Sequence, residues 1–403
     1  MRRIADLHIH SHYSASTSPQ MTLPELAVTA KRKGIDLLGT GDCTHAGWLD
    51  ALSTQLREAN DGVYRHDGVS FLVTGEVSLV WRHDGRGRRI HIVLVVPSLD
   101  DAFAIRDALA LRGNVDYDGR PMLGLSAPDF CEIVWERSPA TLLVPAHIWT
   151  PWYSVFGSKS GFDALEDCFG EYTHRICAVE TGLSSDPPMN RRVSALDGLR
   201  LISCSDAHSP RNLAREATLF ELERVTFSAV TDALRTGDGY GGTFEFYPQE
   251  GKYHYDGHRA CGVRWSPEQS NAVGGTCPVC GKPMTLGVLH RVEELADREE
   301  PVLDAPYRSL IPLAEIIAQA VGKGVNTKTV RAIYDAMLER SGTELDILLE
   351  QALDALTGSA PDHVLEGIAK MRAGNVTIEP GYDGVYGTVA IPFDGRGARD
   401  KRR

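Results

Sequence analysis

The sequence predicts an α/β protein, with a barrel or doubly wound sheet followed by a small metal-binding unit and a mainly helical region. Over about the first 245 residues, short apolar runs alternate with amphipathic helical segments, a pattern typical of such folds. Most of these apolar runs end in a histidine or an acidic residue. Beyond residue 246 the composition changes, and two short pairs of zinc-type ligands precede a helical pattern that starts near Leu286.

The composition and the net charge of the chain restrict the classes of protein to which it can belong. The 403 residues can form two or three domains, and no apolar run is long enough to cross a bilayer. The chain enters its first strand without a signal peptide, and its eight cysteines are spread too widely for a disulfide framework. We therefore expect a cytoplasmic protein with no membrane partner. The net charge of −12 disfavours a simple non-specific nucleic-acid binder, although bound divalent ions would neutralise part of it.

The first strand, at residues 4–12, carries His8 and His10. Because side chains alternate between the two faces of a strand, both imidazoles point the same way and form half of a metal site. Residues 22–25 read Thr-Leu-Pro-Glu, which predicts a capping box that opens a helix ending at Gly34.

Later apolar runs lead to further residues of metal-binding type. A predicted hairpin at 77–96, turned at 84–87, carries His91 early in its return strand. In chain order, the runs at 35–40, 69–74, 141–144, 176–179 and 201–204 lead to Asp42 and His45, Glu76, His147, Glu180, and Asp206 and His208.

These residues should converge, because the active site of an α/β barrel lies at the C-terminal ends of its strands. Mixed imidazole and carboxylate ligands suit transition metals, and a carboxylate can bridge neighbouring ions. We expect two or three divalent ions (Zn²⁺, Mn²⁺, Fe²⁺ or Mg²⁺), with Asp206, Glu76 and His147 as the catalytic candidates. The predicted ligands are His8, His10, His45, Glu76, His91, His147, Asp206 and His208.

A cluster of such ions favours phosphoester hydrolysis, because it activates water, orients a phosphate and stabilises both the entering and the leaving oxygen. A binuclear amidohydrolase uses similar ligands, and the ligand types alone leave that alternative open.

A long connection at 149–169 is rich in glycine and aromatic residues, which is typical of a functional lid at a barrel mouth, with a packed Ω-loop as the alternative. Trp149, Trp152, Tyr153 and Phe156 are candidates for contact with substrate, and core packing is the competing interpretation. Glu180 is a candidate substrate contact or a partner of the metal ligands.

A second constellation consists of His258 and Cys261, followed fifteen residues later by Cys277 and Cys280. Two ligand pairs separated by a loop predict a tetrahedral structural zinc site, and a closed set of three cysteines and one histidine leaves no position open for catalysis. His254 competes with His258 as the fourth ligand.

The helical region contains an apolar segment, a Gly-x-Gly turn and a second helix start within residues 316–331. With Lys323 and Lys328 nearby, this segment weakly resembles a helix-hairpin-helix element that would bind a DNA phosphate, and an ordinary helical hairpin is an equal alternative. A Gly- and Tyr-rich hairpin at 378–387 and a basic run follow; the run contains Arg396, Arg399, Lys401, Arg402 and Arg403.

Several motifs together resemble the PHP (polymerase and histidinol phosphatase) superfamily. They are Asp-Leu-His-Ile-His-Ser, Gly-Thr-Gly-Asp-Cys-Thr-His, Gly-Glu-Val, Ala-His and Ser-Asp-Ala-His, all within residues 1–245. The resemblance implies a distorted seven-stranded β/α barrel with a trinuclear metal centre. The usual Thr-Asp-His of the family stands here as Gly-Asp-Cys, so His45 or Asp42 takes that ligand position.

The rest of the chain resembles the endonuclease Q family. The matching motifs include Glu-Gly-Lys-Tyr-His-Tyr-Asp-Gly-His-Arg-x-Cys, Cys-Pro-Val-Cys-Gly-Lys-Pro and Ile-Glu-Pro-Gly-Tyr-Asp-Gly-Val-Tyr-Gly. This resemblance implies a PHP domain at 1–245, a zinc knuckle at 246–290 and a mainly helical DNA-binding region at 291–403. It implies a DNA-repair endonuclease that nicks on the 5′ side of uracil, hypoxanthine, xanthine or abasic sites, with damaged DNA as its partner.

Two other functions remain open on the sequence alone. A small-molecule phosphatase of the histidinol-phosphate type would share the metal centre, but it gives no reason for the zinc knuckle. A non-catalytic, helicase-associated DNA-binding module would be expected to lose ligands, whereas this chain keeps nearly all of them. A sliding clamp is a candidate partner that the sequence does not decide.

Overall fold

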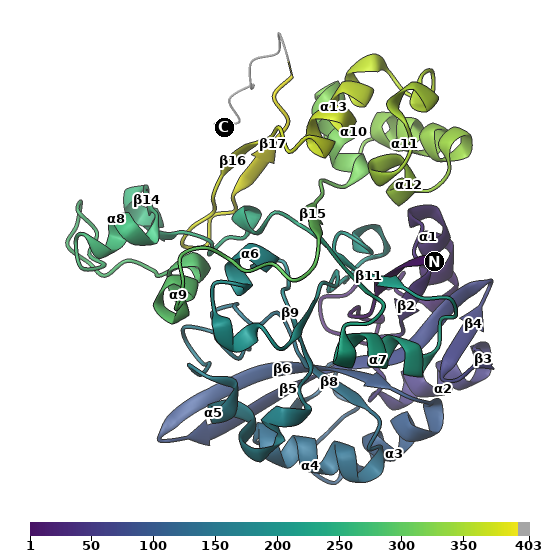
Figure 1. Ribbon diagram of the computed structural model, residues 1–403, viewed down its shortest axis with the longest axis vertical. Coiled ribbons are helices and arrows are strands. Elements are labelled where there is room, and N and C mark those ends of the chain that lie inside the picture. The colour runs from purple at the N-terminus through teal and green to yellow at the C-terminus, as the bar shows by residue number, and fades with distance from the viewer. Residues whose placement is uncertain (394–403) are drawn as a thin grey trace.

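The computed structural model describes residues 1–393, and its centre is a large mixed sheet (Figure 1). Its main path is β15-β12-β11-β1-β2-β5-β4-β3, while β6 pairs with both β5 and β8, and β7 pairs with β5. The strand bounds are β1 Arg2–Asp6, β2 Leu37–Gly39, β3 Arg57–Asn60, β4 Val63–His66, β5 Val69–His83, β6 Arg86–Val96, β7 Met122–Leu123, β8 Leu142–Pro145, β11 Ala217–Glu221, β12 Tyr240–Glu245 and β15 Tyr307–Ser309.

The strands do not close into a barrel. β9 (Ala178–Glu180) and β10 (Arg200–Ile202) form a separate parallel pair. Backbone hydrogen bonds of the segments that follow the strands connect this pair to its neighbours: Ile148 donates its N–H to the carbonyl of Glu180, Asp206 donates to the carbonyl of His8, and His10 donates to the carbonyl of Ala207. The predicted α/β organisation is therefore confirmed, and its ring of strands is open at β9 and β10.

Helices cover the sheet because their apolar faces need burial. They are α1 Leu23–Lys33, α2 Ala46–Gln55, α3 Leu99–Ala110, α4 Ala127–Arg137, α5 Leu165–Phe169, α6 Pro187–Asn190 and α7 Phe227–Thr236. α1 begins and ends as predicted, and Gly34 follows it with a φ of 87°, a left-handed conformation that glycine adopts without strain. Thr22 occupies the N-cap position but makes no side-chain capping bond, so the predicted capping box is wrong in that detail.

The chain leaves the sheet after β12 and forms a small unit with β13 (Asp256–His258), β14 (Val263–Trp265), α8 (Pro267–Asn271) and α9 (Val288–Leu295). It then returns to the sheet, where β15 pairs in parallel with β12. Figure 1 shows this small unit projecting to one side of the sheet.

A group of helices follows β15: α10 Leu313–Val321, α11 Lys328–Ser341, α12 Glu344–Leu349 and α13 Asp362–Arg372. Glu344 connects the helices of this group with one another and with α1. Its carboxylate accepts hydrogen bonds from the Tyr334 hydroxyl at 2.7 Å and the Leu313 N–H at 3.1 Å, and lies 3.2 Å from the ammonium of Lys33 at the end of α1. Because Lys33 and Glu344 are both buried, removal of one partner would leave an uncompensated charge.

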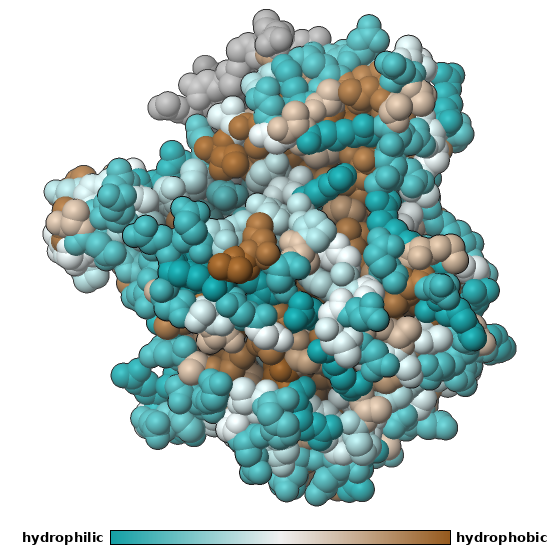
Figure 2. Space-filling model, viewed as in Figure 1, coloured by the Kyte–Doolittle hydropathy of each residue, from teal (hydrophilic) through white to brown (hydrophobic). Residues whose placement is uncertain are grey.

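The short strands β16 (Thr377–Glu379) and β17 (Thr388–Ala390) form the predicted terminal hairpin. The basic run from Arg396 onward lies outside the described residues. In the view of Figure 2, the surface is mostly hydrophilic and is interrupted by small apolar groups, one of them over the helices at the top. Within residues 1–393, no helix is long and apolar enough to cross a membrane.

Candidate metal centre

Glu76 lies at the middle of two groups of potential ligands. One group contains His8, His10, Glu76 and Asp206, and the other contains Glu76, His91 and His147. In each group the ligand atoms lie within 4.8 Å of one another. Residues that are up to 198 positions apart in the sequence therefore meet at one place. His8, His10, His147 and Asp206 follow the ends of strands as predicted, whereas Glu76 lies within β5, which continues to His83 without the predicted end, and His91 lies within β6.

The two oxygens of Glu76 face different groups. Its Oε2 lies 3.4 Å from Nε2 of His8 and 3.3 Å from Nε2 of His10. Its Oε1 lies 2.7 Å from Nδ1 of His91 and 3.2 Å from Nε2 of His147. Such a carboxylate is placed to bridge two cations.

Three atoms at the centre are buried and have no hydrogen-bond partner in the described part of the chain: Nε2 of His8, Nε2 of His10 and Oδ1 of Asp206. Leaving a buried polar atom unpaired costs about 1–3 kcal/mol. Imidazole nitrogens and carboxylate oxygens are common ligands of Zn²⁺, Mn²⁺ and Fe²⁺. The residues present therefore fit divalent cations.

The electrostatics of the centre are dominated by burial and by opposite charges. Burial by itself lowers the pKa of His8, but the carboxylates of Glu180 and Glu76 outweigh it and raise that pKa well above its usual value. Burial lowers the pKa of His91 to about 4, so this imidazole is neutral near pH 7, as a metal ligand must be. Burial opposes ionisation of Glu76, yet His91, His8 and Arg120 together hold its pKa well below the usual range.

Carboxylates behind the imidazoles fix their orientation. Nδ1 of His8 lies 2.9 Å from Glu180, which also accepts the backbone N–H of His147 at 2.8 Å. Nδ1 of His10 lies 3.0 Å from Asp42. Partners of this kind hold a histidine in the tautomer and direction that metal binding needs.

The backbone is strained at three of these positions. Asp42, His147 and Asp206 have φ values of 49°, 31° and 46°, which non-glycine residues rarely adopt. Each follows a strand directly or within a few residues, so the turn that ends the strand aims its side chain into the centre. Strain of this kind is concentrated at functional sites.

Of the two remaining predicted histidine ligands, only His208 contacts residues of the centre in the described part of the chain. His208 is partly exposed, with Nδ1 3.6 Å from Oδ1 of Asp206 and its ring 4.5 Å from that of His10. His45 belongs to neither ligand group in residues 1–393; its ring stacks on Tyr13 at 4.1 Å. Asp42 is also outside both groups, and its carboxylate holds His10 and the N–H of Ser11.

Arg120 is a residue of this site that the sequence pattern did not indicate. Its guanidinium donates a hydrogen bond to Oε2 of Glu76 at 3.2 Å. It stands on the loop between α3 and β7, which is held in place by bonds from Gly119 to Tyr13 and from Ala15 to Asp118. Only these tertiary contacts bring it to the centre, so no strand-end or spacing signal marks it.

The aromatic candidates of the 149–169 connection divide into two kinds. Trp149 and Phe156 are buried in the core, and Trp149 donates to Asn190 at 2.8 Å, which matches the core-packing interpretation. Trp152 is 43% exposed, and the ring of Tyr153 lies 4.7 Å from that of His91. Only Trp152 and Tyr153 are therefore placed to meet a substrate.

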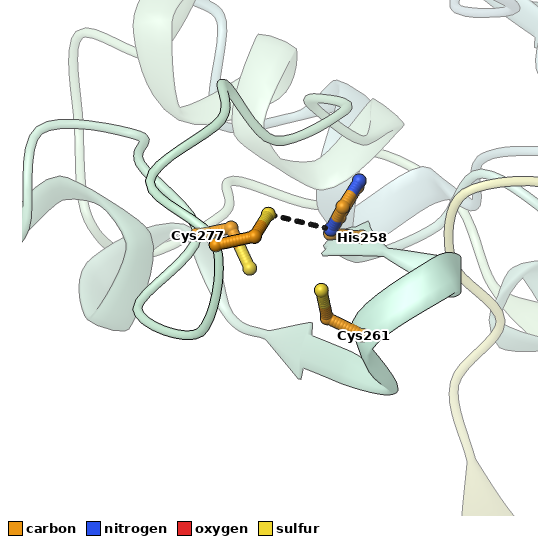
Figure 3. A group of neighbouring side chains, drawn as sticks. His258, Cys261 and Cys277 are labelled. Atoms are coloured by element: carbon orange, nitrogen blue, oxygen red, sulfur yellow. Dashed lines mark hydrogen bonds between the residues drawn. The ribbon is translucent and has the colours of Figure 1, made fainter.

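The cysteine cluster lies in the small unit, away from the sheet. His258, Cys261, Cys277 and Cys280 have ligand atoms within 4.8 Å of one another, and Nδ1 of His258 lies 3.5 Å from the sulfur of Cys280 (Figure 3). This donor set suits tetrahedral zinc. His254 is buried elsewhere and stacks on Tyr255 at 5.5 Å, so the structure groups His258 and not His254 with the cysteines.

The helical hairpin between α10 and α11 leaves Lys323 and Lys328 exposed. Gly322 ends α10 with a φ of 63°, and Thr327 caps α11 by accepting the N–H of Val330. Asn326 in this hairpin accepts a hydrogen bond at 2.8 Å from Arg211, which lies three residues after His208. The hairpin thus contacts the segment that follows His208.

Comparison with known proteins agrees with this architecture. Residues 312–375 match the family described as MJ0043 C-terminal domain. The chain is 35% identical over 254 residues to the uncharacterized protein MJ0043 of Methanocaldococcus jannaschii, and that match spans 31% of the length of the relative. It is 29% identical over 412 residues to the uncharacterized protein YqxK of Bacillus subtilis, which it covers completely.

Two solved structures match over nearly the whole chain. One is the lesion-specific endonuclease PfuEndoQ of Pyrococcus furiosus, with a TM-score of 0.88, 34% identity, and coverage of 97% of this chain and 96% of that one. The other is endonuclease Q in complex with a 27-mer duplex that has an abasic lesion at the active site, with a TM-score of 0.85, 34% identity and 97% coverage of both chains. By this identity and coverage, and as its sequence motifs predict, the chain belongs to the endonuclease Q family.

Proposed function

We propose that this chain is a metal-dependent DNA endonuclease that nicks the phosphodiester on the 5′ side of a damaged base. The substrates we expect are uracil, hypoxanthine and xanthine, which arise by deamination, and abasic sites. The observation that carries the proposal is the position of Glu76 between two ligand groups, within a fold shared with lesion-specific endonucleases. Two or three divalent ions held there would supply Lewis acid catalysis and an activated water for an in-line displacement.

The residues of the centre would have three roles: holding the ions, orienting the imidazoles and binding a phosphate oxygen. His8, His10, His91, His147 and Asp206 would hold the ions together with Glu76, while His45 and His208 are further candidates. Asp42 and Glu180 orient the imidazoles. Arg120 would bind a phosphate oxygen once the carboxylate of Glu76 is engaged by a cation, because its guanidinium already reaches the centre.

Recognition of the lesion would use the weak pairing of damaged bases. Extruding such a base from the duplex costs less free energy than extruding an intact one, and a pocket can then read its altered edge. Trp152 and Tyr153 are candidates for stacking on bases. Lys323 and Lys328, exposed on the helical hairpin, are candidates for contacts to the phosphate backbone.

The cysteine cluster would hold one structural zinc. His258, Cys261, Cys277 and Cys280 form a closed set, so this ion has no open position for substrate. We propose that the chain is organised as the PHP domain at 1–245, the zinc knuckle at 246–290 and the DNA-binding region at 291–403. A sliding clamp as a further partner stays a prediction.

The proposal is tested by a nicking assay on duplexes that contain each of the four lesions, with Mn²⁺, Mg²⁺ or Zn²⁺ added. We expect 5′ nicks that leave a 3′-hydroxyl and a 5′-phosphate, and no nick by a folded Asp206→Asn variant. The proposal is wrong if metal-replete protein leaves every lesion intact. Hydrolysis of a small phosphate ester in that case would favour the phosphatase alternative.

A further inference from the structure

The strands β5 and β6 extend beyond the sheet as a two-stranded ribbon, here defined as residues 80–89. β7 pairs with β5 at Ser78 and Leu79, and β8 pairs with β6 from Ile92 to Val95, so no third strand of the described chain pairs with the ribbon. At its base, the backbone of Arg89 exchanges hydrogen bonds with Ser160. Figure 1 shows these two strands projecting at the lower left of the molecule. The same two strands supply Glu76 and His91 to the metal centre.

The register shows which ribbon side chains share the face of the metal centre. Ser78 lies opposite His91, Val80 opposite Arg89, and Arg82 opposite Gly87. Opposite residues share a face, and alternate residues along a strand return to that face. Glu76 and His91 point into the centre, so Arg89 and Arg82 continue the same face outward.

The ribbon is strongly basic in an acidic chain. Residues 82–89 contain four arginines and one acidic residue, Asp84, although the net charge of the whole chain is −12. Arg89 lies 5.7 Å from the ring of Tyr153, and Arg82 donates to the carbonyl of Gly85. Neither arginine forms an ion pair with a carboxylate in residues 1–393. Both guanidinium groups are therefore available to an anion.

We propose that Arg89 and Arg82, on the ribbon face that continues from Glu76 and His91, bind backbone phosphates of the DNA that flanks the nicked bond. The inference rests on the proposed function and names a part of the substrate site. At about 3.4 Å per residue, Arg89 and Arg82 lie about 7 and 14 Å beyond His91 along the ribbon. Each strand of B-form DNA carries a phosphate about every 3.4 Å along the axis, so the two arginines reach about two and four phosphates from the nick.

The alternative is that these charges merely protect the ribbon from pairing with other chains. The two explanations differ in their predictions for Arg86, which lies on the opposite face of the same ribbon and is exposed. If only the number of positive charges on the ribbon affects DNA binding, Arg86→Ala should weaken binding as much as Arg89→Ala. If the face matters, only Arg82 and Arg89 contribute to DNA binding.

The test measures the affinity of lesion duplexes by fluorescence anisotropy over a series of salt concentrations, in an Asp206→Asn background so that the DNA stays intact. We expect Arg82→Ala/Arg89→Ala to weaken binding at least about tenfold and to reduce the salt slope by about 2, because two phosphate contacts are lost. Arg86→Ala should leave the slope unchanged. Arg82→Lys/Arg89→Lys should keep most of it, which separates loss of charge from loss of folding.

Shortening the duplex supplies an independent readout. Trimming one flank to about two base pairs should weaken binding to the background protein but not to Arg82→Ala/Arg89→Ala. The inference is overturned if the double variant keeps the affinity and slope of the background, or if Arg86→Ala lowers the slope equally. These outcomes are distinct from failure of the proposed function, in which the otherwise wild-type protein nicks no lesion.

Discussion

The two metal-type clusters of this chain differ in how they are built and in what they leave open. The centre around Glu76 joins residues from five places in the sequence, and it includes carboxylates and a neighbouring arginine. The cysteine cluster comes from 23 consecutive residues in a peripheral unit and consists of three thiols and one imidazole. The mixed donors of the first cluster suit a catalytic centre, whereas the closed set of three cysteines and one histidine in the second suits a structural ion.

Removal of the Glu76 carboxylate, which faces both ligand groups, should have the largest effect. We expect Glu76→Gln to lower the single-turnover nicking rate by at least about 10³-fold, because both ligand groups lose a shared anion. Metal analysis should show about one zinc per chain remaining, in contrast to three or four in the parent. If the variant loses the knuckle zinc as well, the two clusters are not independent.

Arg120→Ala should lower the nicking rate at saturating DNA by about 10- to 1,000-fold, because a positive group that touches Glu76 is lost from the centre. Arg112→Ala, an exposed arginine at the other end of the same loop, is the matched control and should be unaffected. Equal metal content in both variants would show that Arg120 acts on substrate and not on metal retention.

The ion of the cysteine cluster can be removed by Cys277→Ser. We expect loss of one zinc and local loosening of residues 254–285 in hydrogen exchange, because structural zinc contributes its binding free energy to folding. The ions of the Glu76 centre should remain. A nicking rate reduced as far as that of Glu76→Gln would contradict the division into catalytic and structural sites.

A smaller effect concerns two buried carboxylates, Glu216 and Glu245, that form no ion pair within residues 1–393. Burial raises the pKa of Glu245 to about 8, and burial together with Glu245 raises that of Glu216 well above its usual value. At these two groups the folded state binds more protons than the unfolded state. Their contribution to the free energy of unfolding is therefore largest below the unfolded pKa near 4.5 and falls as the pH rises toward 8. Glu245→Gln should raise Tm by a few degrees, about 2–4 °C per kcal/mol, at alkaline pH but not near pH 4; a pH-independent shift would contradict this origin.

Much of both clusters could be predicted because the physical rules involved are local. His8 and His10 belong to one ligand group as their spacing predicts, although they follow β1, which ends at Asp6, and do not lie on it. Cys277 and Cys280 share a turn, as their spacing also predicts. Arg120 could not be predicted, because only tertiary contacts of its loop bring it to Glu76. The choice between His254 and His258 likewise needed the fold, since both have suitable spacing.

Other parts of the prediction depended on packing that the sequence does not encode locally. Trp149 and Trp152 lie in the same aromatic run, yet one is in the core and the other is 43% exposed. The open ring at β9 and β10 was also not visible, because an apolar run of three residues does not reveal which neighbour it pairs with.

Because β15 returns to the edge of the sheet, the unit that carries the cysteine cluster is an insertion whose two ends are both held by the sheet. The chain leaves after β12 and rejoins that same strand at Tyr307–Ser309 before the helices begin. An oxidant or chelator that opened the cysteine cluster would therefore loosen the small unit but leave the position of the helices α10–α13 unchanged. The topology would confine damage at the cysteine cluster to this unit, and the helices after β15 would keep their place beside the sheet.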